Sequence, residues 1–187
     1  MHIKNIFKNI PTLHTPRLIL RRIKRTDIDD IFDYAHNPET SKFLLWYPHE
    51  TKGDTRFYFH NVDKRYKAAE FFDWAIEEKN SCRMIGTCGF TAIHEIDRKA
   101  EVGYVINPRY MGNGYATEAV MRVLEFAFFD LGLERVEARY IIGNDKSRRV
   151  MEKCFMKYEG TQRHSVMAKG RFFDVGVYAV ISSEFKK

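Results

Sequence analysis

The stretch RKAEVGYVINPRYMGNGYATEA, residues 98–119, has the pattern of a strand, a glycine-rich loop and the start of a helix. Two glycines separated by one residue, Gly112 and Gly114, allow a tight turn whose backbone N–H groups all point inward. A helix that begins directly after the loop adds its own free N–H groups and the positive end of its dipole. The sequence therefore predicts a cradle for a pyrophosphate. A strand-to-helix turn that simply needs glycine would have the same pattern, and this alternative stays open.

The helix after the loop has the clearest periodicity in the chain. Counted from Ala116, apolar residues recur at offsets 3, 4, 7, 11, 12 and 15, which places them on one face. Gly132 is typical of a helix C-terminus, and Arg135–Ile142 has the composition of a strand. We therefore expect a right-handed strand–helix–strand unit over residues 98–142, with its two strands parallel.

Antiparallel hairpins are expected on both sides of this unit, because the connections between the remaining apolar segments are short. The expected strands are residues 17–22, 71–77, 84–93, 155–161 and 172–181; the expected helices are 26–37 with Thr26 as N-cap, 51–67, and 144–153 with Asn144 as N-cap. No repeat and no Pro/Gly/Ser-rich linker divides the chain. The prediction is a single domain, residues 1–187, of the α/β class (α+β, mixed sheet).

The composition is that of an ordinary globular protein. Of 187 residues, 44% are apolar and 30% are charged, which excludes a disordered or fibrous chain. No apolar run approaches the ~20 residues that span a bilayer, and the start, MHIKNIFKNIPTL, lacks the apolar core of a secretory signal. Cys82, Cys88 and Cys154 are odd in number and never in CxxC spacing, which argues against disulfides and a zinc site. We expect a cytoplasmic protein that uses no metal and does not bind a membrane.

The net charge of +6 comes from 31 Lys and Arg against 25 Asp and Glu. Such a balance suits an anionic ligand, either nucleic acid or a phosphorylated small molecule. The basic residues are dispersed among acids, so most of them are expected to be solvated surface around one phosphate site. No RNP-like run, zinc-finger spacing or helix-turn-helix glycine pattern is present, so direct nucleic-acid binding is not expected. A non-catalytic module that binds nucleic acid or the ribosome nevertheless stays open as an alternative.

Three nucleotide-binding patterns can be compared with the glycine loop. The P-loop pattern GxxxxGK[ST] is absent, and the dinucleotide pattern GxGxxG fails at its third glycine, where Thr117 stands. The dinucleotide pattern also expects an acidic residue about 20 positions after the loop, and Glu134 or Glu137 lies there. The dinucleotide-binding alternative therefore stays open. The third pattern, [QR]xxGx[GA], fits without exception through Arg109, Gly112 and Gly114.

With this third pattern the sequence resembles the GCN5-related N-acetyltransferases (GNAT), and more narrowly the subgroup that acetylates the N-terminal residue of ribosomal proteins. The resemblance runs over most of the chain, through TPRLILRR, IGTCGF, AEVGYVINP, GNGYATEAV and NDKSRRVMEKCF. It implies acetyl-CoA as co-substrate, direct transfer of its acetyl group to an amine, and a splayed, mostly antiparallel sheet. A central parallel strand pair, flanked by helices, would open to admit the pantetheine arm.

The resemblance also implies the residues that bind acetyl-CoA. The backbone of Tyr104, Val105 and Ile106 would pair with the pantetheine amides, and Asn144 would touch the same arm in addition to capping its helix. The pyrophosphate would lie in the loop and first helical turn formed by Arg109, Met111, Gly112, Asn113, Gly114, Tyr115, Ala116 and Thr117. Lys146 and Arg149 are candidates for the 3′-phosphate of the adenosine, or else belong to a solvated basic helix face.

The catalytic residues are less certain, because the chain departs from the family pattern. Many members carry a tyrosine as general acid where this chain has Met151, and Cys154 replaces a common glycine. Ser147, one helical turn before Met151, is the nearest hydroxyl that could protonate the leaving thiolate, and water is the alternative. The candidate base is Glu101, which alternation places on the same strand face as Gly103 and Val105. It could equally be a surface acid paired with Arg98 or Lys99.

The acceptor is expected to be an α-amine, most of all the N-terminus of a ribosomal protein. An α-amino group has a pKa of ~7.7–8.0 against ~10.4 for lysine, so a weak base such as Glu101 suits it better. A small amine (polyamine, amino acid or antibiotic) stays open, as does a homodimer. Trp46, Trp74 and Tyr104 are candidates to contact the acceptor, with core packing as the alternative.

Overall fold

A computed structural model describes residues 6–70 and 72–185 of the chain. Within these ranges the strands form one eight-stranded sheet in the order β1-β2-β3-β4-β5-β6-β8-β7. The strands are β1 (Leu13–His14), β2 (Leu18–Arg21), β3 (Phe72–Glu78), β4 (Arg83–His94), β5 (Lys99–Ile106), β6 (Arg135–Ile141), β7 (Lys157–Ala168) and β8 (Arg171–Ile181). The helices and helical turns are η1 (Arg25–Asp27), α2 (Ile28–Ala35), α3 (Pro38–Ser41), α4 (Lys52–Lys67), η2 (Pro108–Tyr110), α5 (Tyr115–Glu125), η3 (Phe126–Asp130) and α6 (Asp145–Lys153).

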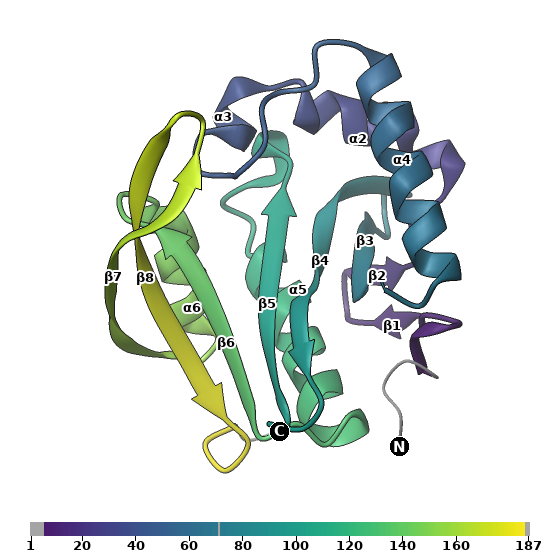
Figure 1. Cartoon of the computed structure of the whole chain (residues 1–187). Coiled ribbons are helices and arrows are strands. Elements are labelled where there is room, and N and C mark those ends of the chain that lie inside the picture. The colour runs from purple at the N-terminus through teal and green to yellow at the C-terminus, as the bar shows by residue number, and fades with distance from the viewer. Residues whose placement is uncertain (1–5, 71, 186–187) are drawn as a thin grey trace.

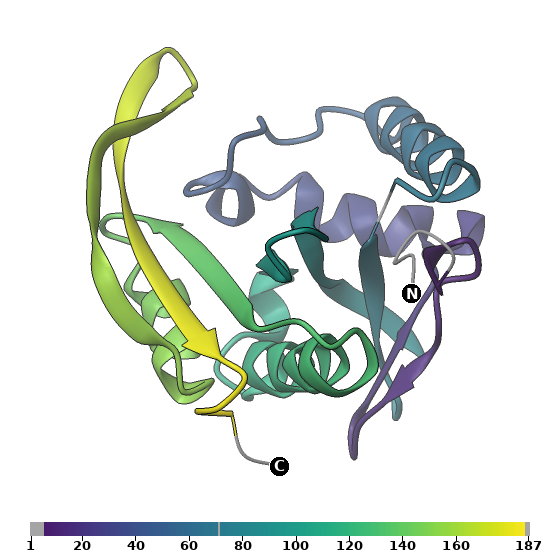
Figure 2. The same ribbon diagram turned by 60° about the horizontal axis from the view of Figure 1, so that its bottom comes forward.

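Helices cover both faces of the sheet, which makes a three-layered α/β domain. α2 and α4 lie on one side and α5 and α6 on the other (Figures 1 and 2). The periodicity of α5 decides which face it buries, because Ala119, Val120, Val123 and Leu124 all point into the core. Each buried apolar side chain of this kind contributes roughly 1.5–3 kcal/mol to stability when it is valine- or leucine-sized.

β5 and β6 are the parallel pair that the sequence predicts, and the other neighbouring strands of the described sheet are antiparallel. The mixed, mostly antiparallel sheet with flanking helices is therefore confirmed. The predicted cap of α6 is present, since Asn144 accepts a hydrogen bond from the backbone N–H of Ser147. The helix expected over residues 51–67 is α4, and the structure adds that Thr51 is its N-cap, accepting hydrogen bonds from the backbone N–H groups of Gly53 and Asp54.

The expected N-cap at Thr26 is wrong. Thr26 lies inside the 3₁₀ turn η1, and α2 begins only at Ile28. The reason is the neighbouring carboxylate: Asp27 accepts hydrogen bonds from the guanidinium of Arg21 at 2.8 Å and from the backbone N–H of Lys24 at 2.7 Å. This buried ion pair between β2 and the turn fixes where the helix starts.

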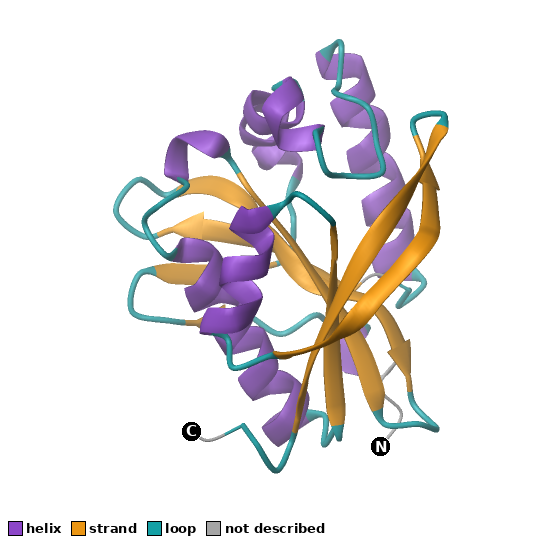
Figure 3. Cartoon of the chain, turned by 90° about the vertical axis from the view of Figure 1, so that its left-hand side faces the viewer, coloured by secondary structure: helices purple, strands orange, loops and turns teal. Residues whose placement is uncertain are grey.

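The last hairpin is longer than expected. β7 runs to Ala168 rather than ending near Thr161, and β8 lies between β6 and β7. The hairpin extends past the edge of the sheet toward the helices of the N-terminal half (Figure 3). At its tip the ammonium group of Lys169 donates to the backbone carbonyl of Ser41 in α3, at 2.5 Å. The tip therefore contacts the opposite side of the molecule.

Candidate functional site

A cleft opens in the middle of the sheet where β5 and β6 part. Their ladder ends at the pair Val102–Ala138, whereas β5 continues to Ile106 and β6 to Ile141. Beyond that pair, the β6-facing edge of β5 has no ladder partner in the described chain. The backbone N–H and C=O groups of Tyr104, Val105 and Ile106 lie on this segment, so the structure places them where the sequence predicts contacts to a pantetheine arm.

The glycine loop, residues 109–114, lies between the end of β5 and the start of α5. Gly112 and Gly114 have φ values of +84° and +80°, a region that other residues enter only with strain. A Cβ at Gly112 would meet nothing within 4 Å, so this part of the loop is open. Gly114 is the N-cap of α5, and the N–H groups of the first helical residues therefore have no partner within the helix. The loop and helix end fit a pyrophosphate.

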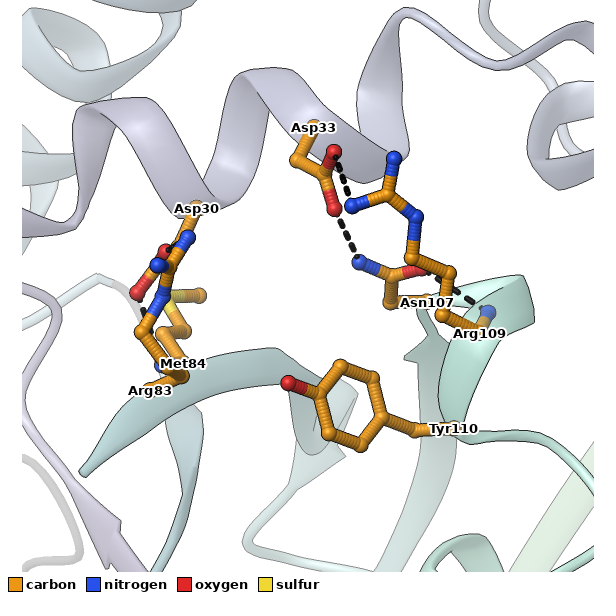
Figure 4. Close-up of a pocket in the computed structure, with 7 residues that line it drawn as sticks. All are labelled: Asp30, Asp33, Arg83, Met84, Asn107, Arg109 and Tyr110. Atoms are coloured by element: carbon orange, nitrogen blue, oxygen red, sulfur yellow. Dashed lines mark hydrogen bonds and ion pairs between the residues drawn. The ribbon is translucent and has the colours of Figure 1, made fainter. Parts of the chain in front are cut away.

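Asp33 of helix α2 contacts Asn107 and Arg109, the residues that lead into this loop (Figure 4). Asn107, which is buried, accepts a hydrogen bond from the backbone N–H of Arg109 at 3.0 Å and donates to the carboxylate of Asp33 at 2.8 Å. The guanidinium of Arg109 lies 3.0 Å from the same carboxylate. Arg109 therefore opens the loop as predicted, but its side chain turns toward α2. Sequence reasoning missed Asp33 and Asn107, although an Asn-Pro pair directly before the loop is a capping signal.

The loop has a second support in the N-terminal segment. Arg17 donates to the backbone carbonyl of Asn113 at 2.9 Å and to the carboxylate of Glu118 in α5 at 2.7 Å. Its guanidinium also lies 4.6 Å from the centre of the Tyr115 ring. Arg17 belongs to the TPRLILRR segment, but no spacing rule links a residue so early in the chain to the loop.

Tyr104 and Ser147 meet across the cleft. The phenol of Tyr104 lies 2.9 Å from the Ser147 hydroxyl and donates to the Ser147 carbonyl at 3.0 Å. Burial raises the pKa of the Tyr104 phenol well above its usual value, so the group stays protonated. Met151, which stands in the usual place of the family's tyrosine, is buried. Sequence reasoning assigned the backbone of Tyr104 to the pantetheine arm and its side chain to the acceptor, and missed that this side chain brings a phenol to Ser147.

Glu101 lies just below the point where the strands part, on the face of the sheet that also carries Gly103 and Val105. Its carboxylate accepts a hydrogen bond from the hydroxyl of Thr91 at 2.9 Å and pairs with the guanidinium of Arg139 at 3.1 Å. The neighbours expected from the sequence have other partners, since Arg98 pairs with Glu134 and Lys99 with Asp97. Both Glu101 oxygens are therefore engaged.

The aromatic residues predicted to contact the acceptor are distributed differently. Trp74 is fully buried, packs against Phe7, Phe90 and Phe126, and donates its indole N–H to the carbonyl of Pro11. It is a core residue that no acceptor can contact in this structure, because its strand alternation turns it toward α5. The Tyr104 phenol turns to α6 instead. Trp46 lies half-buried in the α3–α4 loop beside His49.

A cavity of about 400 Å³ adjoins the end of β6 and the start of β8. We call it the hairpin pocket; it is lined by Phe43, Ile141, Ile142, His164, Arg171, Phe172, Phe173 and Asp174. Asp174 accepts a hydrogen bond from the backbone N–H of His164 at 2.7 Å, and the guanidinium of Arg171 lies over the Phe173 ring. The pocket thus combines five apolar side chains with His164, Arg171 and one carboxylate, and its accessible surface is more polar than apolar. None of the three aromatic residues predicted to contact the acceptor, Trp46, Trp74 and Tyr104, lines it.

The remaining predicted residues lie on α6 and at the surface. Arg149 is exposed, and the Lys146 ammonium lies 3.7 Å from the sulfur of Met111, which places α6 beside the glycine loop. Among the described residues, no group of three or more His, Cys, Asp or Glu side chains is arranged to hold a metal ion. Within the same part of the chain, no helix is long and apolar enough to cross a membrane.

Comparison with known proteins agrees with this geometry. Residues 17–157 match the family model described as acetyltransferase (GNAT) domain. The uncharacterized N-acetyltransferase YoaA of Bacillus subtilis (strain 168) is 32% identical over 171 residues, which cover 91% of this chain and 97% of that protein. An acetyltransferase (GNAT family) from Bacillus anthracis has a similar crystal structure, with a TM-score of 0.83 at 25% identity, covering 93% of this chain and 100% of that chain.

Two further solved structures share the fold at lower identity. The spermidine N-acetyltransferase from Vibrio cholerae, solved in complex with CoA and spermine, has a TM-score of 0.76 at 24% identity and covers 91% of this chain and 98% of that chain. The ribosomal-protein-S5-alanine acetyltransferase from Vibrio fischeri has a TM-score of 0.79 at 22% identity and covers 95% of this chain and 100% of that chain. Proteins with this fold therefore act on different amines.

Proposed function

Because this chain belongs to the GNAT family and is an acetyl-CoA-dependent N-acetyltransferase, we propose that its acceptor is the N-terminal α-amine of a protein, a ribosomal protein above all. Acetyl-CoA supplies the acetyl group as a thioester. In this proposal the cleft edge of β5 binds the pantetheine arm, and the glycine loop with the first turn of α5 binds the pyrophosphate. The proposal includes a cytoplasmic location, where ribosomal proteins are made.

The hairpin pocket is the observation that supports a peptide acceptor. Five of its eight lining residues are aromatic or aliphatic, which suits the first side chain of a peptide, and the polar part of its surface can pair with the peptide backbone. Asp174 is its one carboxylate, and Arg171 is a fixed positive charge in the same lining. A polyamine carries several ammonium groups, each of which would need a carboxylate or carbonyl partner when it leaves water. The pocket is therefore better matched to a chain end with a single amine.

The ionisation of the amine supports the same choice. At pH 7 roughly a tenth of α-amino groups are neutral, but fewer than one in a thousand lysine side chains are. Ser147 is proposed to protonate the departing thiolate, with the Tyr104 phenol holding the serine hydroxyl in place. Since the thiol of coenzyme A has a pKa near that of cysteine, ~8.5, a single hydrogen-bond donor is sufficient to assist it.

The test is a panel of acceptors at saturating acetyl-CoA, followed through release of the free thiol. A peptide that begins with a small apolar residue and has a free α-amine should be acetylated. The same peptide with a blocked N-terminus and an internal lysine is the matched control and should be inactive. Spermidine is the third member of the panel. If spermidine or the lysine peptide reacts faster than every free N-terminus, the proposed acceptor is wrong, while the acetyltransferase activity itself is unaffected.

A further inference from the structure

One buried carboxyl group lies level with the point where the cleft opens. Asp73 of β3 is paired with Gly89 of β4, and Gly89 is paired with Gly103 of β5. Gly103 is the first β5 residue after the last pair with β6, Val102–Ala138. Directly opposed residues of antiparallel strands point to the same face of the sheet, so Asp73 and the two glycines share a face with Glu101. With strands ~4.8 Å apart, the row from β3 to the cleft is about 10 Å long.

At Gly89 and Gly103 no side chain projects above the sheet in this row of residues. A Cβ on Gly89 would lie 2.8 Å from the Oδ1 atom of Asp73 and 2.3 Å from the Phe72 carbonyl, so no larger residue fits there. The Asp73 carboxyl consequently lies close over the backbone of β4. A Cβ on Gly103 would meet only the methyl group of Thr91, at 2.7 Å. Between the carboxyl and the cleft, neither glycine contributes a side chain.

The Asp73 carboxyl is incompletely satisfied within the protein. Its Oδ1 atom is buried and has no hydrogen-bond partner. Leaving such an atom unpaired is unfavourable, and buried polar groups are seldom left so unless they have another use. Glu101, by contrast, is held by Thr91 and Arg139. Of these two carboxyl groups on the acceptor-facing side of the sheet, Asp73 is the one with a free oxygen.

From this geometry we propose that Asp73 accepts the proton that the acceptor ammonium must lose, through a water molecule that lies between its carboxyl group and the cleft. The proton passes from nitrogen to that water while a water proton passes to the Asp73 oxygen. The neutral amine then forms the C–N bond with the thioester carbonyl as the C–S bond breaks. Ser147 gives its proton to the thiolate sulfur and is reprotonated by the second nitrogen proton, and Asp73 later returns its proton to solvent. The proposal rests on the acetyltransferase activity and holds for either class of amine.

The electrostatic surroundings agree with such a role. Burial raises the pKa of Asp73 to about 7, against the opposing effects of the Thr87 side chain, the Trp74 backbone and Arg65. A proton acceptor works best when its pKa lies near the operating pH. The other groups close enough to interact with this carboxyl are Tyr34 of α2, Tyr58 and Tyr66 of α4, and Cys88 of β4. Burial raises the pKa of each of these four groups, so they stay neutral and Asp73 is the group that titrates.

The test compares Asp73→Asn with Glu101→Gln and with Asp97→Asn, an exposed carboxyl away from the row. For Asp73→Asn, kcat at pH 7 should fall about 100-fold, a typical value for a lost proton acceptor. The deficit should shrink to about threefold at pH 9, where the α-amine deprotonates itself. The KM for acetyl-CoA should change by less than about twofold. Glu101→Gln should show a smaller and pH-independent loss, and Asp97→Asn none.

A second variant tests the route of the proton between the cleft and Asp73 without changing Asp73. Gly103→Ala places a methyl group against that of Thr91, so Thr91, whose hydroxyl holds Glu101, must shift. A blocked path should lower kcat with the pH dependence of Asp73→Asn, whereas a disturbed Glu101 should give the pH-independent loss of Glu101→Gln. A pH-independent ratio of Asp73→Asn to wild-type rate would assign Asp73 a structural role. A loss confined to the KM for the amine would make it a binding residue, and a pH-dependent loss only in Glu101→Gln would transfer the role to Glu101. Each of these results overturns the proposal.

Discussion

At the scale of single residues, Tyr104 and Ser147 are the pair that we propose in place of the family's tyrosine. The family's tyrosine position is occupied by Met151, which is buried and cannot donate a proton. The phenol of Tyr104, from a strand rather than from α6, instead lies 2.9 Å from the Ser147 hydroxyl. The single phenol proton is donated to the Ser147 carbonyl, so the Ser147 hydroxyl donates to the phenol oxygen in this structure. In the proposed step this hydroxyl turns from the phenol to the thiolate, so the two groups act as one unit.

The pair predicts a specific pattern in the variants. Ser147→Ala should lower kcat about 100-fold, since loss of general acid catalysis typically costs 10²–10⁴-fold. Tyr104→Phe should lower kcat about tenfold, and the double variant should be no slower than Ser147→Ala, because groups that act as a unit are not additive. Ser147→Thr, which keeps the hydroxyl, is the control and should retain activity. Multiplicative losses, or losses seen mainly in the KM for acetyl-CoA, would contradict a shared role in proton donation.

Residue-level contacts of this kind are the part of the site that the sequence predicts least. Tyr104 and Ser147 are 43 positions apart, and only the splayed strand pair brings them together. Glu101 pairs with Arg139 rather than with its neighbours Arg98 or Lys99, because β5 and β6 are parallel neighbours. Local spacing identifies which residue types are available, but their partners depend on tertiary pairing.

At the scale of elements, α2 couples to the glycine loop through one carboxylate. Asp33 receives a hydrogen bond from Asn107 and an ion pair from Arg109, on either side of Pro108 (Figure 4). Asn107 in turn caps the short turn η2 that leads into the loop. The loop geometry that suits a pyrophosphate therefore depends on a helix from the other layer of the fold.

We expect Asp33→Ala to weaken acetyl-CoA binding without abolishing catalysis. The loop would lose its fixed entrance, so the KM for acetyl-CoA should rise about tenfold, which corresponds to about 1.4 kcal/mol. At saturating acetyl-CoA, kcat should fall by less than about threefold. Asp33→Asn keeps one acceptor oxygen and should have a smaller effect. Asp29→Ala, an exposed carboxylate of the same helix, is the control. Equal KM values for Asp33→Ala and wild type would show that the loop holds its shape unaided.

The positions of the helices and strands are the feature that the sequence predicts best. Strict periodicity located α5, the glycine positions marked its start, and short polar turns marked the hairpins β3–β4 and β4–β5. The errors have physical causes outside local pattern. Asp27 forms an ion pair with Arg21, so α2 begins after Asp27 and Thr26 is not its cap. β7 is longer than expected because its outer half pairs with β8. The insertion of β8 beside β6 depends on the global topology, which short segments do not encode.

At the scale of the whole molecule, the buried Asp73 has a consequence for stability that is separate from catalysis. Its pKa is raised by burial from an ordinary 3.8 to about 7. Between these values the folded protein holds a proton that the unfolded chain has released, so the free energy of unfolding falls as pH rises. Several surface carboxylates act in the opposite direction at lower pH. The pKa values of Asp63, Glu118 and Glu159 are lowered, mainly by basic or hydroxyl partners, and their stabilisation is lost as pH falls through the acidic range.

Asp73→Asn should isolate the buried group, because asparagine has the same shape and no charge. The free energy of unfolding of the variant minus that of wild type, measured by urea titration, should increase as pH rises from 5 to 8 and then level off. The expected total is about 1–3 kcal/mol, below the ~4 kcal/mol that a shift of about three pKa units would give without solvent penetration. Asp97→Asn should give a difference that does not vary with pH, since its carboxylate is exposed. A variant that is slower at pH 7 yet more stable at pH 8 would separate function from folding at this residue. A difference that stays constant across the range would mean that Asp73 is ionised in the fold at low pH and is not the group we describe.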